Sequence, residues 1–287
     1  MKYWKMSLLL TTLVLLLTAC EKSLIDDESV SDSNDDANVV LKLSAYEQLP
    51  FGTRSTKDIS ALCSRLNVAF FQNSTKVSTV SQKEGDSDFG TVSLSLAEGT
   101  YQVVIIAHNC DGSATITSEE KVTFPSNIVS DTFYYYGTLT VSNAQTVYNI
   151  ELKRAVSMFR LELTSDLPAN AAKIRFYYTG GSSTFIPYSG YGCVNSRQTV
   201  MMNVSAGQRV FEVYTLPHEE TDVLKIVVSV YNSNDDVLAE HTFENVPVTR
   251  NKITQYTGEF LGGNSRTGSS FNLTANDEWE GKDNYTF

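Results

Sequence analysis

Hydrophobic and polar residues alternate with a period of two along most of the chain that follows residue 37. In residues 91–96, Val92, Leu94 and Leu96 alternate with residues that carry hydroxyl groups. Alternation of this kind predicts β-strands with one buried face. The same pattern recurs in the segments 146–152, 158–164 and 173–179. Helical periodicity is scarce, so the pattern predicts a chain built of β-strands.

Two strand pairs are predicted as hairpins. The segment 100–107, TYQVVIIA, is apolar on both faces in its middle, which is typical of a strand inside a covered sheet. Together with residues 91–96 and the turn between them, it predicts a first hairpin. Residues 223–231 and 237–243, joined by the turn NSNDD, predict a second hairpin.

Short strands recur about every ten residues, and Gly, Ser and Asn turns join them, which is typical of β-sandwiches. A boundary near residues 152–155 divides this part of the chain into halves of similar size. The sequence therefore predicts an all-β fold with two tandem β-sandwich domains, an N-terminal one at 38–153 and a C-terminal one at 154–287.

The N-terminus has a different pattern. Lys2 and Lys5 precede an apolar run from Ser7 to Ala19, which is shorter than the roughly 20 residues of a membrane-spanning helix. Residues 1–19 are predicted to be a signal peptide. Leu17-Thr18-Ala19-Cys20 resembles a bacterial lipobox, so Cys20 is the predicted site of lipid attachment. The alternative is a cysteine that falls at this position by chance. Because one acyl chain binds a membrane only marginally, stable anchoring needs several chains, such as palmitate.

Residues 20–37 are predicted to be an acidic tether. Residues 21–37 contain seven acidic residues and a single lysine. A segment of this composition repels itself and has few apolar side chains to bury. The simplest interpretation is a linker. An acidic patch soon after a lipidated cysteine also resembles the surface-export signal of Bacteroidetes lipoproteins. Asp26, Asp27 and Glu28 would form that patch, and the expected location is the outer face of the outer membrane.

Charge and motifs exclude several functions. The net charge is −11 and no Lys/Arg-rich stripe is present, so nucleic-acid binding is not expected. Of the three histidines, His108, His218 and His241, none belongs to a catalytic motif: HEE at 218–220 lacks the second histidine of a zinc protease helix. The acidic stretches at 85–88 and 234–236 do not complete a calcium loop and are expected to be turns. We therefore expect no enzymatic activity, no metal and no cofactor.

Three cysteines follow Cys20. Cys63 and Cys110 lie on predicted strands of the N-terminal half, and an extracytoplasmic location permits a disulfide between them. Buried free thiols are an equally simple interpretation. In the first case Cys193 is left unpaired.

Three stretches carry a resemblance to a known family. The block that opens with KRAV at 153–156, the stretch GYGCVNSRQT and the later VTRNKIT at 248–254 resemble the fimbrillin superfamily of Bacteroidetes. Within it, the chain is most similar to the minor fimbrial or anchor subunit lipoproteins of type V pili. The resemblance implies two transthyretin-like Greek-key sandwiches, no enzymatic activity and a role in fimbria assembly and cell adhesion. The implied partners are other fimbrial subunits, which assemble by β-strand exchange, with a host or glycan ligand as a further partner.

The first strand and the loop after it carry the physical basis of strand exchange. Residues 38–46 predict an apolar strand, and its four inward side chains would contribute about 6–12 kcal/mol. The polar loop 47–58 contains Arg54, which resembles the site where an arginine-specific protease cuts polymerising fimbrillins. An ordinary loop arginine is the alternative, and an anchor subunit would stay uncut.

The C-terminus and the aromatic residues leave two further alternatives. The Gly/Ser-rich segment 261–270 separates the tail 271–287 from the stretch YTGEF that precedes it. The tail either donates a strand to another subunit or completes a sheet of its own chain, and we favour the second. The alternative function is a surface glycan-binding lipoprotein that uses Tyr134, Tyr135 and Tyr136 or Trp279 as a stacking platform. Aromatic clusters in strands more often serve packing.

Overall fold

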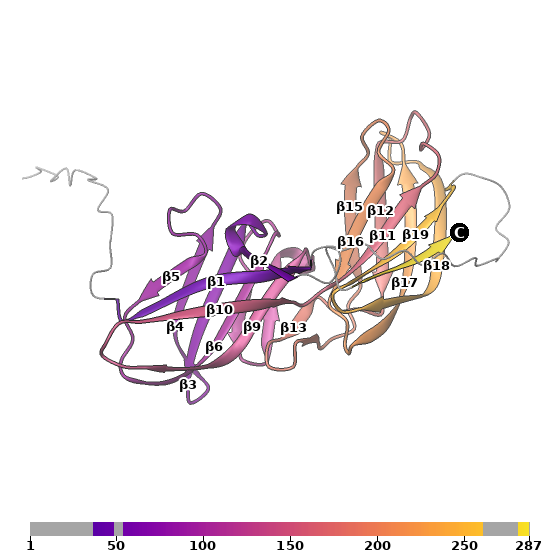
Figure 1. Ribbon diagram of the computed structural model, residues 1–287. Coiled ribbons are helices and arrows are strands. Elements are labelled where there is room, and N and C mark those ends of the chain that lie inside the picture. The colour runs from indigo at the N-terminus through magenta and orange to yellow at the C-terminus, as the bar shows by residue number, and fades with distance from the viewer. Residues whose placement is uncertain (1–36, 49–53, 261–280, 287) are drawn as a thin grey trace, which may run out of the picture. The chain divides into compact units, whose positions relative to one another are not determined.

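The computed structural model describes residues 37–48, 54–260 and 281–286, and these are almost entirely β-structure (Figure 1). It contains strands β1 to β20 and two short 3-10 segments, η2 (Ile59–Ala61) and η3 (Pro125–Asn127). None of the helical segments in this part of the chain has the length and hydrophobicity to cross a membrane. The predicted all-β sandwich class is confirmed. The described residues fall in one compact unit, so the division at residues 153 and 154 stays a prediction.

The largest sheet comes from the N-terminal half and has eight strands. In spatial order it contains β2 (Arg54–Asp58), β1 (Val39–Gln48), β10 (Thr146–Arg154), β9 (Thr132–Val141), β6 (Gly99–His108), β3 (Arg65–Gln72) and β4 (Thr75–Lys83), and β5 (Thr91–Leu94) pairs with β1. The first predicted hairpin is wrong, because β5 pairs with β1 while β6 pairs with β3 and β9. Asn38 explains the change, since its side chain bonds both the N–H and the C=O of Leu96 and holds the end of β5 beside β1.

The C-terminal half forms two four-stranded sheets. One has the order β16 (Val210–Thr215), β11 (Ser157–Leu163), β19 (Lys252–Gly258) and β20 (Gly281–Thr286). The other has the order β15 (Gln198–Asn203), β12 (Lys173–Thr179), β17 (Thr221–Tyr231) and β18 (Val237–Thr249). The pairing of β17 with β18 confirms the second predicted hairpin. The inward side chains of both sheets share one apolar cluster, in which Phe159, Phe176 and Phe211 are fully buried.

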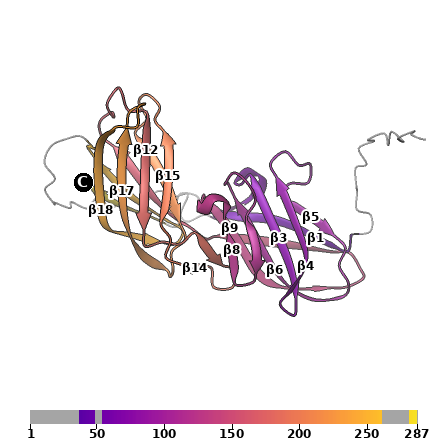
Figure 2. The ribbon, with the colours of Figure 1, turned by 180° about the vertical axis from the view of Figure 1, so that it is seen from behind.

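A small fourth sheet joins strands from the two halves of the sequence (Figure 2). Its order is β14 (Tyr191–Gly192), β13 (Thr184–Ile186), β8 (Lys121–Thr123) and β7 (Thr115–Ser118). β8 and β13 are antiparallel, with Val122 opposite Phe185. Nothing in the alternation pattern predicts this pairing, because three-residue strands carry too little periodicity.

β6 is buried on both faces, as its apolar middle predicts. Val103 and Ile105 point into a cluster with β1, β3, β9 and β10. Val104 and Ile106 point to the opposite face and into a second cluster. That second cluster also contains residues of the C-terminal half, among them Phe185 of β13. The central strands of the large sheet are therefore a layer between two apolar cores.

His108 ends β6 inside this layer and is fully buried. Its Nδ1 accepts the N–H of Cys110 at 3.1 Å, and its Nε2 lies 3.3 Å from Oδ1 of Asn67. Oδ1 of Asn67 also accepts the N–H of Ala114 at 2.9 Å. The N–H of Cys110 at Nδ1 fits a neutral imidazole with its proton on Nε2, where the N–H of Ala114, bonded to Asn67, also lies 3.2 Å away. Burial, with a smaller contribution from the charge of Arg65, lowers the pKa of His108 to about 4. His108 is thus a structural residue that joins a strand end to two loops.

The pKa of His108 predicts a loss of stability in weak acid. The folded-state pKa lies below the value of about 6.5 expected in the unfolded chain, so the unfolded state binds more protons as the pH falls. The free energy of unfolding should be fully retained above about pH 6.5 and should fall by about 2 kcal/mol as the pH drops from 7 to 4.5. Urea denaturation of the native chain and of His108→Gln at both pH values measures this term. The native chain should lose more stability than the variant, and equal losses would contradict the assignment.

Candidate functional site

β1, the first strand of the described chain, is paired along both of its sides (Figure 1). It runs parallel to β10 from Val39 to Ala45. On its other side it is antiparallel to β5 over the first half of its length and to β2 over the second half. Because both ladders use its backbone, β1 is an interior strand although it starts the folded chain.

The side chains of β1 fill the core of the N-terminal half. Val39, Leu41, Leu43 and Ala45 are at most 3% exposed, while Lys42 between them is exposed. Three large apolar side chains at about 1.5–3 kcal/mol each contribute about 5–9 kcal/mol. Ala45 adds little, so this value lies slightly below the one expected for four large side chains. It still approaches the whole stability of a domain, about 5–15 kcal/mol.

Arg54 stands at the start of β2, where its backbone pairs with Gln48 at the end of β1. The predicted polar loop 47–58 is therefore shorter than expected, because strands β1 and β2 extend into it from both ends. The intervening residues 49–53 lie outside the described part of the chain. Cys20, the acidic tether up to residue 36 and Trp279 lie outside it as well. The roles predicted for Cys20 and Arg54 stay predictions.

The C-terminal strand β20 lies at the edge of its own chain's sheet. It is parallel to β19, with Lys252 opposite Gly281. The ring of Tyr285 stacks on that of Tyr256, with centroids 4.6 Å apart and planes 20° from parallel. Tyr256 in turn contacts Phe159 in the core. In the structure, this tail completes the sheet of the chain to which it belongs.

The described cysteines are all free thiols, so the predicted Cys63–Cys110 disulfide is not formed in the structure. The reason is that the two side chains belong to different apolar clusters. Burial is the main cause that raises the pKa of both thiols. The Cys110 thiol is placed to donate a hydrogen bond, because its Sγ lies 3.2 Å from the carbonyl oxygen of Ile128 and 3.2 Å from Oγ of Ser130. The exposed Cys193 is 3.7 Å from the carbonyl oxygen of Thr184.

The tyrosine run at 134–136 is engaged in packing. Tyr134 is buried and meets Phe185 edge to face at 4.9 Å. Tyr135 folds over Gly137, where a Cβ atom would stand 2.2 Å from the tyrosine oxygen. Tyr136 donates a hydrogen bond of 2.9 Å to Glu119. These contacts disfavour the glycan-stacking platform that the sequence offered as an alternative.

Both acidic stretches form turns, and their carboxylates are engaged by other groups of the protein. Asp86 accepts the N–H of Lys83 at 2.8 Å, and Asp88 accepts from the amide of Gln82 at 2.9 Å. Asp235 forms an ion pair with Lys173 at 2.7 Å. Across the described ranges, no group of three His, Cys, Asp or Glu side chains is placed to hold a metal ion.

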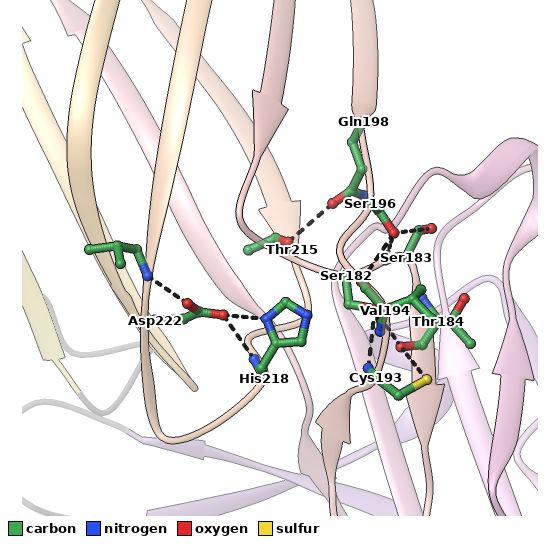
Figure 3. Close-up of polar contacts among 11 residues, drawn as sticks. Ser182, Ser183, Thr184, Cys193, Val194, Ser196, Gln198, Thr215, His218 and Asp222 are labelled. Atoms are coloured by element: carbon green, nitrogen blue, oxygen red, sulfur yellow. Dashed lines mark hydrogen bonds and ion pairs between the residues drawn. The ribbon is translucent and has the colours of Figure 1, made fainter.

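A polar network that sequence reasoning missed surrounds Ser182 (Figure 3). The Ser182 hydroxyl is fully buried and accepts the backbone N–H groups of Thr184, Cys193 and Val194 at 3.1, 3.3 and 3.2 Å. It donates to the carbonyl oxygen of Thr184 at 2.8 Å. One hydroxyl thus fixes the backbone of two segments that are ten residues apart. The run of Gly and Ser at 180–183 was the available signal, because small residues permit this close approach.

His218 and Asp222 form a hydrogen-bonded pair near this network (Figure 3). Nδ1 of His218 lies 2.6 Å from Oδ2 of Asp222, which also accepts the His218 N–H at 3.0 Å. Burial raises the pKa of Asp222, but these hydrogen bonds outweigh it and the net pKa is lowered. Nε2 of His218 is buried and has no hydrogen-bond partner among the described residues. A histidine oriented by a carboxylate is therefore present, but no hydroxyl or thiol is bonded to it as a nucleophile would be.

Removal of the Ser182 hydroxyl should destabilise the chain. Ser182→Ala removes the hydroxyl that accepts the N–H groups of Thr184 and Val194, while the N–H of Cys193 keeps the carbonyl oxygen of Thr184 at 3.1 Å. Each N–H group left unsatisfied costs about 1–3 kcal/mol. After relaxation of the loops we expect a loss of about 2–4 kcal/mol in the free energy of unfolding, measured by urea denaturation. Ser205→Ala, at an exposed position, is the matched control and should change stability by less than about 0.5 kcal/mol. A loss at Ser182 no larger than at Ser205 would show that water replaces the hydroxyl.

Three of the solved structures that match the chain are described here. The fimbrial anchor protein Mfa2 from Porphyromonas gingivalis is 11% identical, with 71% of this chain and 80% of that chain covered and a TM-score of 0.39. A fimbrial assembly protein from Parabacteroides distasonis is 12% identical, with 77% and 90% covered and a TM-score of 0.39. A DUF1812 protein of Bacteroides thetaiotaomicron, proposed to bind polysaccharide, is 11% identical, with 73% and 80% covered and a TM-score of 0.49.

All three TM-scores lie below one half, so these structures do not decide the family. No curated protein matches the chain. The assignment rests on a family model that covers nearly the whole chain. Because the model of DUF6562, a family of unknown function, matches residues 31–287, the chain belongs to this family.

Proposed function

We propose that the protein is a lipid-anchored protein of the outer-membrane surface that serves as a fimbrial anchor or accessory subunit. It tethers or assembles fimbriae through β-strand complementation, and it carries out no enzymatic reaction. Its partners are other fimbrial subunits and, through the lipid on Cys20, the outer membrane. The observation that carries this proposal is the position of β1, which directly follows the predicted tether, pairs with strands on both of its sides and buries the apolar side chains between Val39 and Ala45.

The order of three features along the chain supports an anchor. Cys20, β1 and Arg54 follow one another, so the lipid and the buried strand both precede the candidate processing site. A cut after Arg54 would leave the rest of the chain attached to the membrane only through the non-covalent contacts of β1. An uncut chain keeps the lipid covalently joined to the folded body. The anchor role therefore requires that Arg54 remain uncleaved.

The same order explains how strand complementation would work. Withdrawal of β1 would expose the backbone of β10 on one side and of β5 and β2 on the other, together with the pockets of Val39, Leu41 and Leu43. An incoming strand with apolar residues at alternate positions restores both the ladder and the pockets. The two roles in the proposal use this groove differently: an accessory subunit that releases β1 accepts a strand here, whereas an anchor keeps β1 as its covalent link to the lipid and pairs with other subunits at another strand edge.

Analysis of the mature N-terminus tests the anchor proposal. Mass spectrometry of the protein purified from outer membranes should find an acylated peptide that begins at Cys20 and continues through Arg54. Cys20→Ala should abolish the acylated peptide and release the protein from the membrane, because the hydrophobic anchor is lost. The matched control Cys193→Ala should remain acylated. A mature chain that begins at Ser55 would contradict the anchor and indicate a polymerising subunit.

Immunoprecipitation from detergent-solubilised outer membranes tests the fimbrial partner. The native chain should recover fimbrial subunits in molar excess over itself, since one anchor at the base of a fimbria holds a polymer of many subunits. The same precipitation without the antibody serves as the control for nonspecific recovery. Recovery of no fimbrial subunit, together with retention of the protein on polysaccharide, would favour the glycan-binding alternative.

A further inference from the structure

β15 is the end strand of its sheet. All six of its residues, Gln198 to Asn203, pair with β12 on one side. In the sheet order of the described residues, no strand lies on the other side. An edge of this kind presents unpaired backbone N–H and C=O groups, and natural proteins usually protect it with charges, proline or a bulge.

β15 lacks all of these protections. Its sequence is QTVMMN, which has no charged residue and no proline, and its register with β12 is regular. The other long end strands are protected. β4 has two lysines and a bulge, and β18 has glutamates, a proline and bulges. β16 has a glutamate, β20 has Asp283, and β2 has Lys57 and Asp58. The uncharged end strands β5, β7 and β14 are only four, four and two residues long.

The side chains of β15 leave apolar surface open on both faces. Met201 is 51% exposed on the outer face, between the exposed residues Thr199 and Asn203. On the inner face, Val200 and Met202 pack against the core but are only partly buried. A strand added at this edge would cover all three apolar side chains and satisfy the free backbone groups.

We propose that β15 pairs antiparallel with β15 of a second copy of this chain, about a two-fold axis at Met201. Two four-stranded sheets would then join into one of eight strands. This inference is independent of the fimbrial role proposed above. In a self-pair of this kind every residue meets residues of the same strand, so a charged residue would lie near its own copy and destabilise the pair. The absence of charge from β15 therefore favours a second copy over other partners.

The register follows from the side chains. Centring the pair on Met201 places Val200 opposite Met202 of the second copy on the core face, where both are partly buried. It places the two exposed methionines together on the outer face and Thr199 opposite Asn203. Centring on Val200 would instead set the polar Gln198 opposite Met202. The Met201 register thus matches apolar with apolar and polar with polar.

The nearest cations do not oppose this arrangement. Arg175 is the β12 neighbour of Met201, and it directs its guanidinium to Ser229 at 2.9 Å and Glu240 at 3.8 Å. Both partners lie on the side of β12 away from β15. Lys173, opposite Asn203, is paired with Asp235. Among the described residues, the two cations that neighbour β15 across β12 are thus paired, and Arg197, which precedes β15, stands four residues from the axis.

Cysteine cross-linking in outer membranes that carry the full-length protein tests the proposal. In a Cys193→Ser background, Met201→Cys brings two thiols to the axis, where facing Cβ atoms about 5 Å apart permit a disulfide after small adjustments. Mild oxidation should give a disulfide-linked dimer at least about tenfold more abundant than from Val77→Cys, the matched control at a 46% exposed valine on the protected edge β4. Thr199→Cys alone should not cross-link, while the double variant with Asn203→Cys should.

Sedimentation of the detergent-solubilised protein provides the second measurement. The native chain should contain dimer at micromolar concentration, and Met201→Lys should weaken the dimer by about tenfold or more, since it places two ammonium groups together. Val77→Lys should leave the dimer unchanged. At a protein concentration low enough for the native chain to be monomeric, both variants should keep the native unfolding midpoint, because both side chains are exposed. Equal cross-linking at positions 77 and 201, a monomeric native chain, or a Met201→Cys cross-link to a protein of different mass would each overturn the proposal.

Discussion

The apolar contact on the second face of β3 and β6 is the interaction on which the rest of the structure depends. These strands bury one face against β1 and β10 and the other face in a cluster that includes Phe185, Leu216 and Ile253. Because the second cluster draws on both halves of the sequence, each half completes the other's core. The short pair β8 and β13 adds backbone hydrogen bonds to this contact. Two lengths of chain that could each be taken for a separate sandwich are therefore coupled by buried side chains.

Alternation along the chain was sufficient to predict the class of fold and most of the long strands. It identified the inward residues of β11 and β12, the β17–β18 hairpin and the covered strand β6, since each has several alternating positions and a buried face. It failed for β5, whose partner is set by the side chain of Asn38, which is distant in sequence. It also missed β8, β13 and β14, which are too short to show a period. Partner choice depends on contacts between distant residues, and a local pattern does not contain them.

The candidate site shows the same division. The sequence pointed to the first strand and to its apolar side chains, and the structure places them between two sets of strands. It did not point to the hydroxyl of Ser182, because a buried serine that accepts three N–H groups has no signature beyond nearby small residues. The sequence left open a disulfide or two buried thiols for Cys63 and Cys110 and expected both on strands, whereas in the structure they lie just outside the strands, join different cores and are free thiols. Chemistry that depends on which face a residue occupies needs the folded chain.

The pairing of β1 has a mechanical consequence. In a chain held through Cys20, a pull from the membrane enters the folded body at Val39 and runs along the axis of the strand. Parallel bonds to β10 and antiparallel bonds to β5 and β2 then bear the load together rather than one after another. Rupture in this shearing geometry must break many hydrogen bonds at once and drag three buried side chains through the core. A single strand with partners on both sides thus makes the attachment strong against forces along its length.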